Sequence, residues 1–186
     1  AAQILAEGGI PTTTATAASN PNAGKYWWSF DGSNDSLLSG NLGITNACTI
    51  VIAGRVNALS GFQGLLIETT NGVAVYVNAN GSVDLAKVGV AQVVTTAAGV
   101  IVAGVPFVIT ARLSSGTAVI RNLGTQVATA ATGLTFAAAT GARIGSDFAG
   151  TSYLLNGALG WVVPIAAALS DADCLTVERL VSSQFP

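Results

Sequence analysis

Short runs in which apolar and polar residues alternate dominate the sequence, and this period of two is typical of β-strands that bury one face. In the run from Tyr26 to Phe30, alternation places Tyr26, Trp28 and Phe30 on one face. Trp27 and Ser29 fall on the other face. The same criterion predicts strands at 36–39, 49–56, 64–69, 73–78, 82–86, 92–96, 105–113, 117–122, 126–130, 142–145 and 153–163. Many short strands without parallel crossover units predict an all-β, two-sheet antiparallel sandwich.

Turn-forming residues separate these runs. Asn71-Gly72 and Asn80-Gly81 are hairpin signals, because both residue types tolerate the backbone of a tight turn between antiparallel strands. The segment 31–35, with the sequence Asp-Gly-Ser-Asn-Asp, is a turn by the same chemistry. We therefore expect residues 64–86 to form a meander.

The last part of the chain has the signals of a short helix. Ser170 is suited to cap its N-terminus, and Asp173 stands three residues later, as in a capping box. An apolar face at helical spacing consists of Leu175, Val177, Leu180 and Val181. We expect one C-terminal helix, lying at the rim of the sandwich.

The 186 residues suit one domain with a sizeable core. Residues 1–25 lack a clear period and predict an extended N-terminal arm, held by a neighbouring subunit or by its own sandwich, so the domain is expected at 26–186. Only 9% of residues are charged and the net charge is −2, which argues against nucleic acid as partner. So little charge suits a surface covered by copies of the same chain or by a larger assembly.

Two further features bear on the setting of the protein. No charge occurs between Lys87 and Arg112, which is long enough to cross a bilayer. The stretch is broken by glycines and Pro106 and is rich in valine, so we interpret it as strands and turns and expect no membrane insertion. The sequence also shows no basic and apolar segments of the kind that open a signal peptide.

No set of catalytic residues is recognisable in the sequence. There is no histidine, which removes the commonest general base and the commonest metal ligand. The glutamates Glu7, Glu68 and Glu178 are far apart in sequence, so no strand carries a pair of carboxylates. We expect no enzymatic activity. Cys48 and Cys174 could form one disulfide, but buried thiols explain them better.

Several short motifs occur in an order that is typical of one family. Phe-Asp-Gly-x-Asn-Asp-x-Leu stands at 30–37, Arg-Ile-Gly at 143–145, Leu-Asn-Gly-Ala-Leu at 155–159 and Leu-Ser-Asp-Ala-Asp at 169–173. The chain from Tyr26 to Phe185 thereby resembles the laminin-G-like, concanavalin A-like jelly-roll domains. The resemblance implies a jelly-roll sandwich. Relatives of this kind are sugar- or protein-binding modules of secreted proteins and surface modules of bacteriophage particles, and fold alone does not decide between these roles.

The resemblance also implies a calcium site at one rim of the sandwich. Asp31, Asp35 and Asp147 are the candidate ligands, because all three lie in predicted loops and calcium prefers carboxylate oxygens. The alternative is that these aspartates only form turns. Five aromatic residues could stack on a sugar: Trp27, Trp28, Tyr76, Tyr153 and Trp161. Trp28 and Trp161 are expected to fill the core, and Trp27 and Tyr153 are the candidate binding residues.

Two functions remain open. The first is a structural or attachment module on the surface of a virus-like particle, such as a phage head decoration or tail-fibre protein, with copies of itself, other virion proteins and host-surface glycans as partners. The alternative is a lectin-like, carbohydrate-binding module of a larger secreted bacterial protein, which would place it outside the cell. A degenerate polysaccharide hydrolase is a third and weaker hypothesis.

Overall fold

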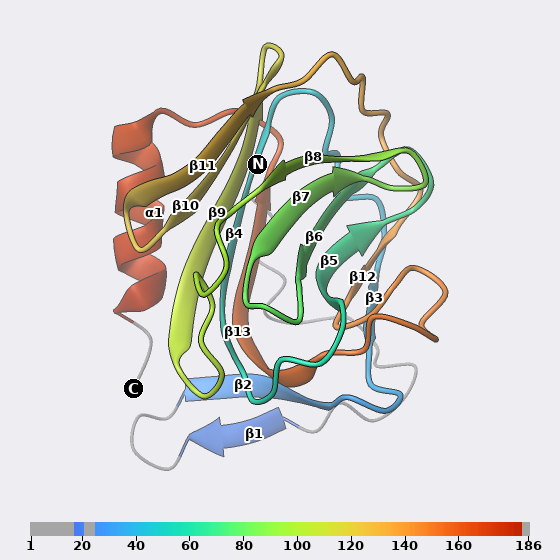
Figure 1. Cartoon of the computed structure of the whole chain (residues 1–186), viewed down its shortest axis with the longest axis vertical. Helices are drawn as coiled ribbons and strands as arrows, with labels where there is room; N and C mark the ends of the chain where they lie inside the picture. The colour runs from blue at the N-terminus through green and yellow to red at the C-terminus, as the bar shows by residue number, and fades with distance from the viewer. Residues whose placement is uncertain (1–16, 21–24, 184–186) are drawn as a thin grey trace.

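Two antiparallel β-sheets face each other in the computed structural model, which describes residues 17–20 and 25–183 (Figure 1). The larger sheet has seven strands in the order β1 (Ala17–Asn20), β2 (Lys25–Asp31), β13 (Asn156–Ile165), β4 (Cys48–Val56), β9 (Pro106–Ser114), β10 (Thr117–Asn122) and β11 (Thr125–Ala131). The smaller sheet has six, in the order β3 (Leu37–Ser39), β12 (Ala142–Ile144), β5 (Gln63–Glu68), β6 (Val73–Val77), β7 (Val83–Lys87) and β8 (Ala91–Thr95). The predicted two-sheet sandwich is confirmed.

The strand order joins distant parts of the chain. β13 pairs with both β2 and β4, and β12 lies between β3 and β5. Loops that are far apart in sequence therefore meet at the same end of the sandwich, as happens between β4 and β13, where Asn57 N donates to Asn156 O over 2.8 Å. This arrangement brings together the loops that carry the candidate site.

The core follows the predicted alternation. Phe30 is 2% exposed and Trp28 packs against the same cluster, so the two residues share the inner face as expected; the side chain of Tyr26 lies outside the described residues. The main contributors from β4 and β9 are Ile50, Ile52, Phe107, Ile109 and Leu113. Trp161 differs from the prediction, because it packs on the outer face of the seven-stranded sheet and not between the sheets.

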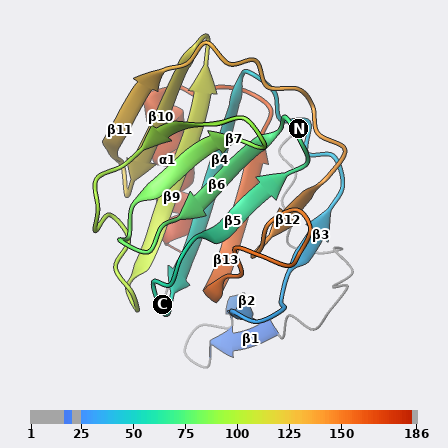
Figure 2. The same cartoon turned by 45° about the vertical axis from the view of Figure 1, so that its right-hand side comes forward.

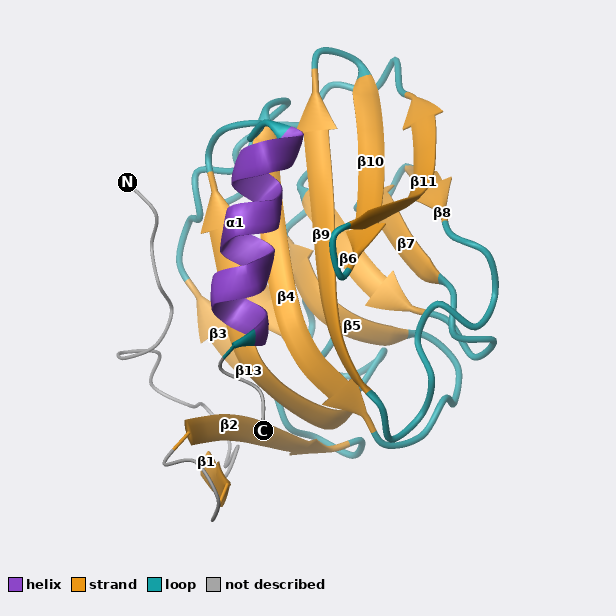
Figure 3. Cartoon of the chain, turned by 90° about the vertical axis from the view of Figure 1, so that its left-hand side faces the viewer, coloured by secondary structure: helices purple, strands orange, loops and turns teal. Residues whose placement is uncertain are grey.

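The C-terminal helix α1 (Asp171–Ser182) begins at the predicted cap. Ser170 Oγ accepts from Asp173 N over 3.1 Å and donates to Asp173 Oδ2 over 2.6 Å. The helix lies across the outer face of the seven-stranded sheet, over β4 and β9, and not at the rim (Figure 3). Val51, Val108 and Val163 form an apolar patch on that face, and α1 covers it with Val181.

The apolar face predicted for this helix is only partly correct. Leu180, which was expected to be part of it, is 66% exposed. Glu178 instead faces the sheet and is 2% exposed. Its Oε1 accepts from Arg121 Nε over 2.9 Å and from Thr110 Oγ1 over 2.7 Å. A buried ion pair thus replaces an apolar contact at the centre of the interface between helix and sheet.

Part of the predicted N-terminal arm lies among the described residues. Residues 17–20 of the arm form β1 and pair with 25–28 of the same chain, while 1–16 and 21–24 lie outside the described residues.

Cys48 and Cys174 are free, buried thiols, as expected. Burial raises the pKa of Cys48 to about 12 and also raises that of Cys174. Among the described residues, no helix has the length and apolar character to cross a membrane.

Glu68 is a second buried carboxyl, at the end of β5. Its Oε2 accepts from Val73 N over 2.8 Å, while Oε1 has no partner. Burial raises its pKa from 4.5 to about 7, although the bond from Val73 lowers it. A carboxyl whose pKa is raised on folding adds stability below its unfolded pKa, and that stability is lost as the pH rises through the folded pKa.

Glu68→Gln is therefore expected to stabilise the protein at pH 8 by about 3 kcal/mol, because the amide removes the cost of ionising a buried group. At pH 4 the variant and the wild type are expected to be nearly equal. Urea denaturation at both pH values measures the difference. The same gain at pH 4 and pH 8 would contradict the role assigned to the charge.

Candidate functional site

Three aromatic side chains meet at one end of the six-stranded sheet, and we call them the aromatic cluster: Phe62, Tyr76 and Tyr153. Ring centroids are 5.4 Å apart for Phe62 and Tyr76, 5.5 Å for Phe62 and Tyr153, and 6.2 Å for the stacked tyrosines. Phe62 is 49% exposed and Tyr153 is 43% exposed. Tyr76 alternates with the buried Val75 and Val77 of β6, so it stands on the outer face of the sheet.

Figure 2 shows the sheet that carries the cluster in front of the seven-stranded sheet, with α1 behind both. Phe62 precedes β5, and Tyr153 lies in the loop between β12 and β13. A strand was expected to begin at Tyr153, but β13 begins only at Asn156. The cluster is therefore built from one strand residue and two loop residues.

The loop before Tyr153 is closed by an aspartate. Asp147 Oδ1 accepts from Thr151 N over 2.8 Å and from Ser152 N over 2.9 Å, and Asp147 N donates to Ser152 O over 2.8 Å. Tyr153 O then accepts from Gly64 N of β5 over 2.7 Å. Asp147 thus holds the loop that positions Tyr153.

Gln63 ties the loop of Phe62 to the same end of the sandwich. The Gln63 side chain is fully buried. Its Nε2 donates to Ala58 O over 2.7 Å, and its Oε1 accepts from Asn156 N over 2.9 Å. The backbone around the aromatic cluster is therefore fixed in advance of any ligand, which lowers the entropy cost of binding.

The backbone of Tyr153 is strained. Its φ is +52°, in the left-handed region, which costs a bulky L-residue about 1–2 kcal/mol relative to glycine. Neighbouring loops use glycine at such angles, as at Gly61 and Gly150. Ser115 and Leu123 also have a positive φ, so the angle shows strain at Tyr153 and does not by itself assign a role to its ring.

An acidic group lies beside the cluster. Asp84 of β7 stands opposite Tyr76 in the sheet and is 1% exposed. Its Oδ2 accepts from Asn78 Nδ2 over 2.8 Å, and its Oδ1 has no partner. Burial, followed by the charge of Asp84, raises the pKa of Tyr76 to about 12. The Tyr76 hydroxyl is therefore neutral, and available to donate a hydrogen bond, at any physiological pH.

The two predicted sugar-binding residues are not brought together. Trp27 lies in β2 of the seven-stranded sheet, and its indole packs over Gly160 of β13, where an added Cβ would come within 3.4 Å of Cε2. Tyr153 belongs to the aromatic cluster on the other sheet. Phe62 was not among the residues expected to contact a sugar. The signal was an aromatic residue directly after Gly61, in a stretch of turn-forming residues.

The three predicted calcium ligands act within their own loops. Asp31 Oδ1 accepts from Ser33 N over 2.7 Å, and Asp35 Oδ2 accepts from Asp31 N over 3.0 Å, while Asp147 closes its loop as described. Within residues 17–20 and 25–183, no three His, Cys, Asp or Glu side chains are grouped so that they could hold a metal ion. These aspartates do not fit a calcium site in the arrangement seen here, and calcium binding stays an untested prediction.

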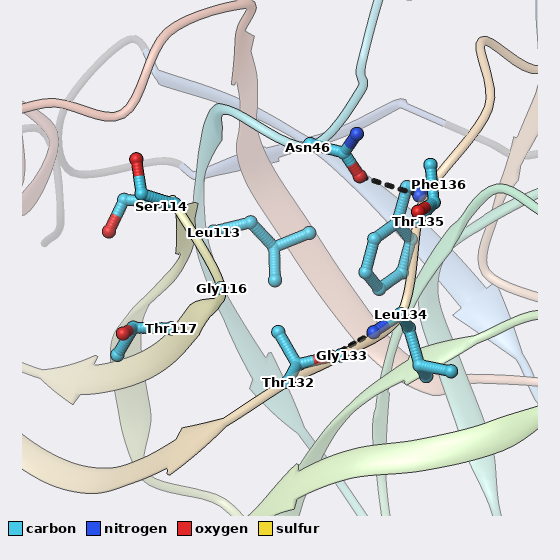
Figure 4. Close-up of a pocket in the computed structure, with 11 residues that line it drawn as sticks. Asn46, Leu113, Ser114, Gly116, Thr117, Thr132, Gly133, Leu134, Thr135 and Phe136 are labelled. Carbon is cyan, nitrogen blue, oxygen red and sulfur yellow. Dashed lines mark hydrogen bonds between the residues drawn. The ribbon is translucent and has the colours of Figure 1, made fainter.

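A pocket of about 290 Å³ lies at the opposite end of the sandwich (Figure 4). It is enclosed by the turn between β9 and β10 and by residues 132–136. Two of its polar side chains bond to the local backbone, since Asn46 Oδ1 accepts from Phe136 N over 2.6 Å and Thr132 Oγ1 accepts from Leu134 N over 3.1 Å. The aromatic cluster, in which Phe62 and Tyr153 are about half exposed, is the stronger candidate site.

Comparison with known proteins shows the fold. No protein-family model matches the chain, and no curated protein matches it. Among solved structures, the CBM40 of the Ruminococcus gnavus IT-sialidase, bound to α2,3-sialyllactose, superposes with a TM-score of 0.61 at 15% identity, over 75% of this chain and 91% of that one. This chain has the lectin-like β-sandwich fold.

Other solved structures with the same fold are longer than this chain. A Trypanosoma rangeli sialidase in complex with the inhibitor DANA has a TM-score of 0.64 at 12% identity, over 87% of this chain but 28% of the sialidase. A putative carbohydrate-binding protein from Bacteroides ovatus has a TM-score of 0.58 at 13% identity, over 74% of this chain and 46% of that protein. At these identities the similarity establishes architecture and not ligand.

Proposed function

We propose that this chain is a non-catalytic, lectin-like module that binds carbohydrate at the aromatic cluster. The observation that carries the proposal is the set of three contacting, partly exposed rings, with Tyr153 held at an unfavourable backbone angle. Solved structures with this fold include carbohydrate-binding modules. The proposal thus favours the lectin-like alternative over a virion structural role.

The chemistry of the cluster suits a sugar. The faces of aromatic rings are electron-rich, and the C–H groups on one face of a pyranose carry partial positive charge, so the two stack favourably. Tyrosine hydroxyls donate and accept hydrogen bonds, as sugar hydroxyls do. A preformed platform with polar tips therefore supplies both contacts that a neutral sugar ring needs.

A non-catalytic role agrees with the positions of the glutamates. Glu68 is buried at the end of β5, and Glu178 is buried beneath α1 on the outer side of the other sheet. These two carboxyls do not flank a common cleft, as glycoside hydrolysis requires. Glu7 lies outside the described residues.

We place the module outside the cell, as part of a larger protein. The virion hypothesis rests on composition, namely low charge and an alanine- and threonine-rich arm, and the comparisons reported above add no virion protein to its support. Self-association through the weakly charged surface remains compatible with glycan binding. In that case several copies would increase avidity.

Screening the purified protein on a glycan array, once with calcium and once with a chelator, tests the proposal. Wild type is expected to bind a defined set of glycans. Tyr153→Gly is expected to weaken this binding about tenfold or more, a loss of about 1.4 kcal/mol. Its melting temperature is expected to stay within about 3 °C, because relief of backbone strain offsets the lost ring contacts.

Two control variants sharpen this test. Phe148→Ala removes an exposed ring from the same loop and is expected to keep full binding, as is Trp27→Ala on the other sheet. Loss of binding in Trp27→Ala but not in Tyr153→Gly would move the site to the seven-stranded sheet. If the wild type binds no glycan on the array, either with calcium or with the chelator, the proposed function is overturned. Binding that the chelator and Asp147→Asn both abolish would establish a calcium requirement.

A further inference from the structure

The charge around the aromatic cluster determines which sugars it can accept. Tyr76 of β6 pairs with Asp84 of β7, which pairs in turn with Thr95 of β8. Val83 and Leu85 on either side of Asp84 belong to the core. Asp84 therefore stands on the outer face of the six-stranded sheet, the same face as the cluster.

Among the side chains that the structure describes, no cation pairs with this carboxylate. The hydrogen bond that Asp84 receives comes from the neutral amide of Asn78, and Oδ1 is buried without a partner. The ion pairs found among the described residues all join α1 to the seven-stranded sheet, through Arg112 and Arg121. Because a nearly dry environment screens charge poorly, the negative charge of Asp84 extends to Tyr76 and to any ligand that stacks there.

The basic residues nearest to this face do not offset the charge. Lys87 lies three residues after Asp84 in β7, so alternation places it on the opposite face. Arg143 of β12 is two strands from β6, and its guanidinium donates to Phe148 O over 2.8 Å and to Ser36 Oγ over 2.7 Å. These bonds direct the Arg143 guanidinium toward its own loop and toward Ser36, and no ion pair found among the described residues joins it to Asp84.

We infer that the aromatic cluster selects uncharged glycans and rejects those that carry a sialic acid, a uronic acid or a sulfate next to the stacked ring. The inference rests on the proposed function and narrows it to a ligand class. It also separates this chain from the Ruminococcus gnavus CBM40, which shares the fold and was solved with α2,3-sialyllactose. An anionic substituent on the cluster would approach Asp84 with no cation between them.

Matched pairs of glycans test the inference directly, with lactose against 3′-sialyllactose and other neutral oligosaccharides against their sialylated and sulfated forms. Wild type is expected to bind the neutral member of a pair about tenfold or more tightly. Raising the salt concentration from about 0.01 M to 1 M is expected to leave most of this difference in place, because salt screens a buried charge such as Asp84 much less than an exposed one.

Asp84→Asn supplies the decisive variant. The amide has the shape of the carboxylate and can still accept from Asn78, so the fold is expected to persist, which the melting temperature checks. The preference for neutral glycans is expected to fall at least threefold, on the same order as one screened charge interaction. Asp173→Asn on α1 makes the same change of net charge on the far side of the protein and is expected to leave the preference intact.

The outcomes distinguish this inference from the proposed function. Equal or tighter binding of the anionic members, or a preference that Asp84→Asn does not change, would overturn the inference and leave glycan binding in place. Failure of wild type to bind either member of every pair would overturn the proposed function and the inference together. A preference for uncharged glycans that is reduced in Asp84→Asn would support both the proposed function and the inference.

Discussion

Gly145→Ala is expected to lower the free energy of unfolding by about 2–5 kcal/mol. Gly145 has a φ of +87°, which is costly for alanine, and a Cβ at this position would overlap Cε1 and Cδ1 of Phe30. Phe30 is 2% exposed in the core and cannot move aside. Gly145 O also accepts from Leu155 N over 2.8 Å, so the strain would reach the loop that carries Tyr153.

Equilibrium unfolding in urea measures this effect. Gly40→Ala is the matched control, because a Cβ there meets no atom within 4 Å and the backbone is not in the left-handed region. The control is expected to stay within about 0.5 kcal/mol of wild type, as surface substitutions usually do. Similar stability of the two variants would show that Phe30 and Gly145 do not pack as described.

Arg121→Met is expected to destabilise the protein by about 3–5 kcal/mol, because it leaves Glu178 buried without its cation. The two side chains are 6% and 3% exposed and are joined by a bond of 2.9 Å. Burial alone would lower the pKa of Arg121, but the hydrogen bond from Arg121 to Glu178 and the negative charge of Glu178 raise it above its usual value. Loss of this pair is expected to detach α1 from β9 and β10.

A second substitution distinguishes the effect of the unpaired Glu178 charge from the effect of losing the Arg121 side chain. In Arg121→Met with Glu178→Leu, no charge is left buried, and the double variant is expected to regain most of the lost stability. Arg179→Met removes an exposed arginine from the same helix and is expected to change stability by less than about 0.5 kcal/mol. Circular dichroism during urea unfolding follows all three variants. A double variant as unstable as Arg121→Met alone would contradict the role of the charge.

These contacts divide the molecule into a scaffold and an end that carries the candidate site. The buried ion pair and the contact between Gly145 and Phe30 stabilise the packing of helix and sheets. The aromatic cluster depends instead on loops fixed by Asp147 and Gln63. A rigid scaffold that positions variable loops is a common arrangement for binding proteins, and it allows ligand preference to change without loss of the fold.

The motifs that resemble the laminin-G-like family acquire a physical explanation in the structure. Phe30 opens the first motif and Gly145 closes the second, and the two residues touch in the core although 115 positions separate them. A side chain at position 145 would displace the ring at position 30. The order of these motifs therefore indicates a packing requirement that the fold imposes.

Local chemistry determined the strands, the turns and the helix cap. Alternation of apolar residues identified strands such as β2, where Trp28 and Phe30 face the core, whereas β4 and β5 are buried on both faces and were identified by their apolar runs. The Asn71-Gly72 turn formed where predicted, with Asn71 at a φ of +68°, because its residue types favour that backbone. Ser170 caps α1 for the same local reason. These features depend on residues that are neighbours in sequence.

Tertiary structure alone decided which side chains meet. Trp27 and Tyr153 were both candidates to stack on a sugar, but Trp27 lies in the seven-stranded sheet and Tyr153 lies in a loop that packs on the six-stranded sheet. Phe62, Tyr76 and Asp84 join Tyr153 because β5, β6 and β7 are neighbours and the loop before β13 returns to β5. Glu178 is buried because Arg121 lies opposite it on another element. The sequence determined the elements through short-range preferences, whereas the site and its charge arise from contacts between residues far apart in the chain.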